Sequence, residues 1–140
     1  MFRSAVSAEG ARPLPTLDGW WLARSASLGG VRLTADVLPA LTMLLFDRTL
    51  YLGNDIGRLD IDRGTDPPSL DILITRGPNR WRFIPGIFKQ QGRRLQLCVD
   101  LSGVTRPADF MAPLGSRLLS VTYDCAPVDD GPSDCAPLFA

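Results

Sequence analysis

The chain has 140 residues, of which 45% are hydrophobic, and this is enough for one domain with a sizeable core. Its 15 basic and 15 acidic residues cancel, so the overall charge gives no reason to expect a nucleic-acid or membrane partner. Histidine is absent and only three cysteines are present, which removes the usual general base and disfavours a zinc site. We therefore expect a protein that is not an enzyme and that uses no metal and no cofactor.

Residues 1–16 are mostly small and polar and include two prolines, so we expect them to form a flexible N-terminal arm. They contain no apolar run of signal-peptide length. The longest apolar stretch of the chain, residues 38–46, is far too short to span a bilayer. These features predict a cytoplasmic protein without a membrane span.

From residue 17 onward, short apolar runs alternate with Gly, Pro and Asn-Asp, which is typical of antiparallel strands. A short helical turn is expected to start at Thr34, its N-cap, and to be stopped early by Pro39. Hairpin turns are expected at the Asn54-Asp55 and Gln91-Gly92 steps. The expected strands are 19–27, 41–46, 48–53, 56–62, 69–76, 80–89, 93–100 and 117–123.

Apolar residues alternate with polar ones along these segments, as they do in strands with one buried face. Four sets of side chains are expected to share a face: Leu70, Ile72 and Ile74; Trp81, Phe83 and Ile87; Leu95, Leu97 and Val99; and Leu119, Val121 and Tyr123. The pattern predicts an all-β fold, an eight-stranded antiparallel up-and-down barrel over residues 17–123, with a β-sandwich as the alternative. Such a barrel is either packed solid or leaves room for one small ligand.

Several short motifs follow one another in a fixed order along the predicted strands. They are Leu17-x-Gly19-x-Trp21, the strand from Gly57 to Asp62, Pro68-Ser69-Leu70-Asp71, Gly86-Ile87-Phe88, Gly92 through Leu95 to Cys98, and Arg106-Pro107 with Phe110. In these motifs the chain resembles a family of lipocalin-like bacterial domains, mostly of unknown function. The resemblance implies a calycin-type barrel. The chain departs from the family at Phe88, where a tyrosine is usual, and at Arg93, where an acid is usual.

The resemblance implies that most of these motif residues serve the scaffold. In lipocalin-like barrels the tryptophan of the first motif plugs the closed end, and the preceding glycine lets the strand bend. Arg106 is expected to pair with Asp109 or Asp71 as a strut, with an Arg-Asp pair acting on a substrate as the alternative. Phe110 is expected to fold over a barrel end. The residues given a structural role are Gly19, Trp21, Asp71, Gly86, Cys98, Arg106, Pro107 and Phe110.

Arginines flank two neighbouring predicted hairpins and suggest an anion-attracting rim at the barrel mouth. The rim consists of Arg76, Arg80, Arg82, Arg93 and Arg94, and an ordinary solvated end is the alternative. Trp81, Phe83 and Leu97 are expected to line an apolar cavity below it, with plain core packing as the alternative. The predicted ligand-binding residues are Trp81, Phe83, Leu97, Arg80, Arg82 and Arg94.

Residues 124–140 form an acidic C-terminal tail with a net charge of −4, whereas residues 1–123 carry +4. Its aspartates, Asp124, Asp129, Asp130 and Asp134, are predicted to bind a partner or to neutralise the arginines. Cys125 and Cys135 flank a turn-forming segment. They are expected to form either a disulfide bridge or two free thiols, and the sequence does not decide between these alternatives.

Two hypotheses about function follow from these features. The first is a non-catalytic binding protein, a lipocalin-like barrel that holds a small apolar or anionic ligand. The alternative is a protein-binding module, such as a cytoplasmic immunity protein that neutralises a bacterial toxin through its acidic tail. No nucleic-acid partner is expected under either hypothesis.

Overall fold

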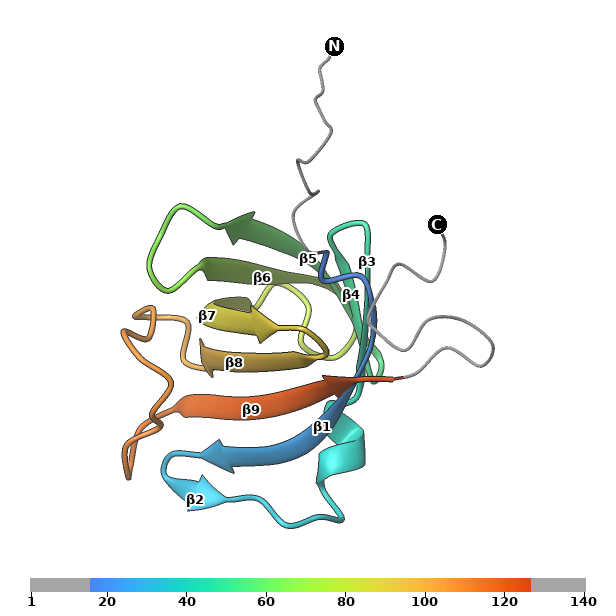
Figure 1. Ribbon diagram of the computed structural model, residues 1–140. Helices are drawn as coiled ribbons and strands as arrows, with labels where there is room; N and C mark the ends of the chain where they lie inside the picture. Colours follow the sequence, from blue (N-terminus) through green and yellow to red (C-terminus); the bar gives the residue numbers. More distant parts are fainter. Residues whose placement is uncertain (1–15, 127–140) are drawn as a thin grey trace.

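A computed structural model describes residues 16–126, and within this range eight antiparallel strands close into one barrel. Each strand pairs with the next along the chain, and β9 closes the barrel by pairing with β1, beside which it lies in Figure 1. The strands are β1 (Gly19–Leu28), β3 (Met43–Phe46), β4 (Thr49–Leu52), β5 (Asp55–Asp62), β6 (Ser69–Arg76), β7 (Phe83–Gln91), β8 (Arg94–Asp100) and β9 (Leu118–Cys125). The short β2 (Val31–Arg32) pairs with the end of β1. The prediction of an all-β up-and-down barrel is confirmed.

Because successive strands run in opposite directions, successive connections lie at opposite ends of the barrel. One end, here called the pocket end, carries the β3–β4, β5–β6 and β7–β8 connections. The other end, here called the loop end, carries the β1–β2, β4–β5, β6–β7 and β8–β9 connections. The last of these, residues 101–117, is the longest and is drawn in orange in Figure 1.

The barrel interior is filled by side chains from alternate positions of the strands. Three of the four predicted sets point inward, with Ile74, Val99 and Tyr123 each less than 5% exposed. Trp21 is completely buried below Leu17, whose carbonyl oxygen accepts a 2.8 Å hydrogen bond from the indole N–H. The remaining void is about 10 Å³ and has only apolar neighbours, so it offers at most the space of one water molecule.

The set formed by Trp81, Phe83 and Ile87 was predicted on the wrong face. In β7 it is Phe88 that points into the core, while Ile87 points outward and Phe83 is exposed. Ile87 is nevertheless only 2% exposed, because the outer face here is covered by the 101–117 segment. A strand with two buried faces gives no alternation from which its inward face can be predicted.

The segment of residues 101–117 is fastened across the outer face of the sheet. A guanidinium nitrogen of Arg106 donates to the carbonyl oxygens of Leu70 and Gly86 at 3.2 and 3.0 Å, and lies 2.7 Å from an Asp71 carboxylate oxygen. Of the two partners expected for Arg106, the structure therefore has Asp71. The Phe110 carbonyl accepts from the Ser120 hydroxyl of β9, so its backbone crosses the sheet face instead of covering a barrel end.

A turn does start at Thr34, whose carbonyl oxygen accepts from the Val37 N–H at 3.0 Å, but the helix itself follows this turn. The structure has a 3-10 helix, η1 (Leu38–Leu41), with Pro39 in its first turn and without a side-chain cap at its start. Proline is favoured at the start of a helix because the first N–H groups have no partner within the helix. Pro39 therefore begins this element instead of ending it. No helix within residues 16–126 is long and apolar enough to cross a membrane.

Candidate functional site

The five arginines predicted to form one rim lie at opposite ends of the barrel. Arg76, Arg80 and Arg82 belong to the β6–β7 connection at the loop end, whereas Arg93 and Arg94 belong to the β7–β8 hairpin at the pocket end. The nine residues of β7 separate the two groups, which amounts to roughly 27 Å of extended chain. The prediction of a single rim is wrong, because consecutive hairpins of a meander cannot share an end.

The predicted lining of an internal cavity is also not brought together. Leu97 lies in the packed core, but Trp81 and Phe83 are 68% and 46% exposed at the loop end. The interior void is too small to hold an organic ligand. The prediction that these two aromatic side chains line an internal cavity is therefore wrong.

Asp124 lies in β9, which extends to Cys125 and so includes the start of the predicted tail. Its two carboxylate oxygens lie 3.4 Å from Arg24 and 3.2 Å from Arg94. This agrees with the expectation that an acidic residue of the tail neutralises an arginine. The other tail residues of the prediction, Asp129, Asp130, Asp134 and Cys135, fall outside the described residues, as does the N-terminal arm up to residue 15.

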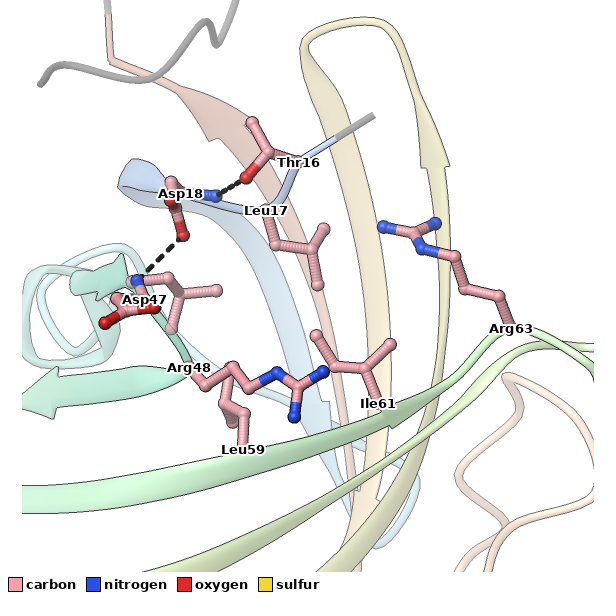
Figure 2. Close-up of a pocket in the computed structure, with 9 residues that line it drawn as sticks. Thr16, Leu17, Asp18, Asp47, Arg48, Leu59, Ile61 and Arg63 are labelled. Carbon is pink, nitrogen blue, oxygen red and sulfur yellow. Dashed lines mark hydrogen bonds between the residues drawn. The ribbon is translucent and has the colours of Figure 1, made fainter. Parts of the chain in front are cut away.

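A pocket of about 240 Å³ opens at the pocket end and combines an apolar floor with charged walls. Figure 2 shows the side chains that surround it. Leu17, Leu45 and Leu59 form the floor, and the same three side chains close the barrel interior from above. The pocket is therefore a depression on top of the packed core and not an entrance to it. The other lining residues are Thr16, Asp18, Asp47, Arg48, Ile61 and Arg63.

One wall of the pocket is a tight turn with an unusual sequence. Asp47 and Arg48 connect β3 and β4, and both have a positive φ, 52° and 62°. A two-residue hairpin turn with this backbone normally contains Asn-Gly, because larger residues are strained there. The Arg48 carbonyl accepts a 2.8 Å hydrogen bond from Leu59, and the Asp47 N–H donates to the Asp18 carboxylate at 3.1 Å. These bonds hold a strained turn that directs the Arg48 side chain over the pocket.

The opposite wall is formed by Arg63, which follows the end of β5. Its guanidinium lies 5.3 Å from the centre of the Phe88 ring, a cation–π distance. In Figure 2 the guanidinium groups of Arg48 and Arg63 approach the pocket from opposite sides, while the Asp47 side chain turns away from both. The basic groups therefore flank the apolar floor, and the acidic groups lie to one side of it. Such an arrangement suits a small molecule with an anionic group.

Sequence reasoning missed this pocket because its residues come from three separate segments of the chain, residues 16–18, 45–48 and 59–63. A signal was present in the Asp47-Arg48 step, since two residues between two strands indicate a tight turn. A residue that holds the pocket lining in place is also distant in sequence. The Thr16 carbonyl accepts a 3.1 Å hydrogen bond from the side-chain amide of Gln90, 74 residues away. Within the described range, no three His, Cys, Asp or Glu side chains gather in a way that could hold a metal ion.

Comparison of the chain with family models, with curated proteins and with solved structures finds no match. The closed antiparallel barrel is compatible with a calycin-type architecture.

Proposed function

We propose that this protein is a non-catalytic, lipocalin-like binding protein that holds a small anionic ligand in the pocket above its barrel. One observation carries the proposal: Arg48 and Arg63 direct their guanidinium groups over the same apolar floor. Guanidinium groups bind carboxylates and phosphates through two parallel hydrogen bonds, and buried leucines beside them add affinity for an apolar group. The strained conformation of Arg48 supports the proposal, since strained backbone is concentrated at binding sites.

The size of the pocket limits the ligand. About 240 Å³ is below the usual range for drug-sized molecules, and the packed core prevents a long chain from entering the barrel. A short carboxylate with a small apolar group fits these limits. Long fatty acids do not.

Calorimetric titration with a series of short monocarboxylates tests the proposal. We expect affinity to rise from acetate to butanoate as the apolar group covers the leucines, and to stop rising for longer chains. Arg48→Gln should weaken the binding by about tenfold, since one charge-assisted hydrogen bond contributes about 1.5 kcal/mol or more. Arg32→Gln is the matched control, because Arg32 is exposed on β2 at the other end of the barrel. Equal affinities of Arg48→Gln and Arg32→Gln for the carboxylates would contradict the proposal.

A second candidate is a protein-binding module, of which an immunity protein is one example. It is favoured by an outer apolar row that runs across four neighbouring strands. In this row Trp20 pairs with Leu44, Leu44 with Tyr51 and Tyr51 with Ile56. Trp20 and Tyr51 are 45% and 42% exposed. Replacing Trp20 with Ser should abolish a stoichiometric complex with a cognate protein in pull-down, whereas Arg48→Gln should leave that complex unchanged.

A further inference from the structure

The loop end carries an exposed aromatic group that neither proposed function uses. Trp81 is 68% exposed, and it occupies a left-handed backbone conformation with φ of 74°. This conformation is unfavourable for a bulky residue and persists only where the surrounding structure imposes it. An exposed indole contributes nothing to the core, so the strain at Trp81 has no reason in the packing of this barrel.

The turn that presents Trp81 is firmly built. The Trp81 N–H donates to the Ile74 carbonyl at 2.6 Å, and Ile74 in turn donates to the Arg82 carbonyl at 3.0 Å. Asn79 is held by both oxygens of the Asp55 carboxylate, through its backbone N–H at 3.0 Å and its side-chain amide at 2.7 Å. The indole is therefore displayed on a rigid support, and little ordering entropy is lost when it binds.

Other apolar side chains are exposed beside Trp81. Phe83 is 46% exposed, and its carbonyl lies next to Gly103 of the 101–117 segment. The neighbouring Val104 is 81% exposed. The same segment exposes Met111 and Leu114, 71% and 84%, where it passes the β1–β2 turn at this end of the barrel. Aromatic and aliphatic side chains are thus exposed on several connections of the loop end.

The turn that presents Trp81 is basic. Residues 76–82 contain three arginines and no acidic residue. Arg76 and Arg80 are exposed in the same turn as Trp81, and Arg82 is tied to the carbonyl of Leu101. The Asp55 carboxylate beside this turn accepts from Asn79 with both oxygens. The Asp100 carboxylate accepts from Ser102, Val104 and Thr105. Asp60 and Asp71 line an open pocket with Phe83 on the outer face of the sheet. Basic residues next to inserted aromatic and aliphatic side chains are the combination that binds anionic lipid surfaces.

We propose that the loop end docks onto the surface of an anionic lipid bilayer, with Trp81, Phe83 and Val104 entering the interfacial layer and Arg76 and Arg80 contacting lipid phosphates. The exposed aliphatic side chains indicate that the partner is a lipid surface and not a nucleic acid. Val104 and Leu114 cannot stack on bases, whereas they gain free energy from acyl chains. The contact is peripheral, because it involves only connections at one end of the barrel. It is independent of the ligand pocket, which lies at the opposite end.

Co-sedimentation with lipid vesicles tests this inference. We expect the protein to bind vesicles of equimolar phosphatidylcholine and phosphatidylglycerol at least about tenfold more tightly than vesicles of phosphatidylcholine alone. Added salt should weaken the binding, since it screens the arginines. Binding should be accompanied by a blue shift of tryptophan fluorescence, as the indole leaves water.

Two tryptophan variants provide matched readouts. Trp81→Asn removes the indole and retains a residue that tolerates the left-handed conformation, so the fold should be unchanged. It should bind the mixed vesicles about tenfold more weakly. Trp20→Asn removes another exposed indole, on β1, and should bind as the unmodified protein does. Circular dichroism melting of both variants checks that they are folded.

Three results would overturn the inference: no binding of the unmodified protein to mixed vesicles at low salt, equal binding by the two tryptophan variants, or Trp81-dependent binding to single-stranded polynucleotides without vesicle binding. The last result would assign the surface to nucleic acid. The Arg48→Gln variant should bind vesicles normally, so a failure here is distinct from a failure of the ligand proposal.

Discussion

Replacing Asp100 with Asn should destabilise the fold by about 2 kcal/mol at neutral pH. Asp100 ends β8 and is 5% exposed. One carboxylate oxygen accepts from the hydroxyl and the N–H of Ser102, at 2.6 and 2.9 Å, and the other accepts from the N–H groups of Val104 and Thr105, at 3.2 and 2.8 Å. These bonds, that of the Ser102 hydroxyl first, lower the pKa of Asp100 from 3.8 to about 2. At about 1.4 kcal/mol per pKa unit, the ionised carboxylate contributes about 2 kcal/mol.

The pH dependence gives the sharper test. A pKa that is lower in the folded state stabilises the fold fully above the unfolded value of 3.8, and this stabilisation is lost as the pH falls through about 2. Urea unfolding at pH 7 and pH 3 should therefore show that the difference between the unmodified protein and Asp100→Asn falls by about half. Asp60→Asn, which changes an exposed carboxylate on β5, should show a difference near zero at both pH values. A difference for Asp100→Asn that stays constant from pH 7 to pH 3 would refute the reasoning.

Three further predictions concern β7, β8 and the segment of residues 101–117 that covers them. Gly86→Ala should cost about 2 kcal/mol in urea unfolding, because an added Cβ would lie 2.6 Å from a methyl carbon of Val99; an unchanged midpoint would contradict this. Arg106→Met should cost about 2 to 3 kcal/mol, since it leaves the Asp71 carboxylate without its cation, and Asp71→Asn in the same background should recover part of the loss. Cys98 is completely buried, which raises the pKa of its thiol to about 11, so the native protein should label with a thiol reagent at pH 8 at this position only after unfolding. Rapid labelling of Cys98 in the folded protein would show that the 101–117 segment opens readily.

The strands were predictable because strand formation depends on local pattern. In β6 and β8 apolar and polar residues alternate. The side chains predicted to point inward, such as Leu70 and Leu97, do lie in the core. In β7 both faces are buried around Ile87 and Phe88, so alternation was uninformative there. Pro39 was interpreted as a helix terminator, although the same missing N–H also suits a helix start.

The candidate site was not predictable in the same way, because it depends on which connections share an end of the barrel. Arg48 and Arg63 are separated by all of β4 and β5, yet they flank one pocket. Arg82 and Arg93 are closer in sequence, yet they lie at opposite ends of β7. Two connections lie at the same end of the barrel when an even number of strands separates them, and at opposite ends when the number is odd. This number is known only when every strand has been assigned correctly.

The sequence by itself determined the all-β class and the approximate positions of the strands, because these follow from short-range alternation and from the turn-forming residues between the apolar runs. The tertiary structure decided that the core is solid, that Phe83 and Trp81 are outside it, and that two distant arginines flank one pocket. These features depend on closure between β1 and β9 and on the path of residues 101–117 over the sheet. Such contacts join residues far apart in the chain, and no local pattern of side chains encodes them.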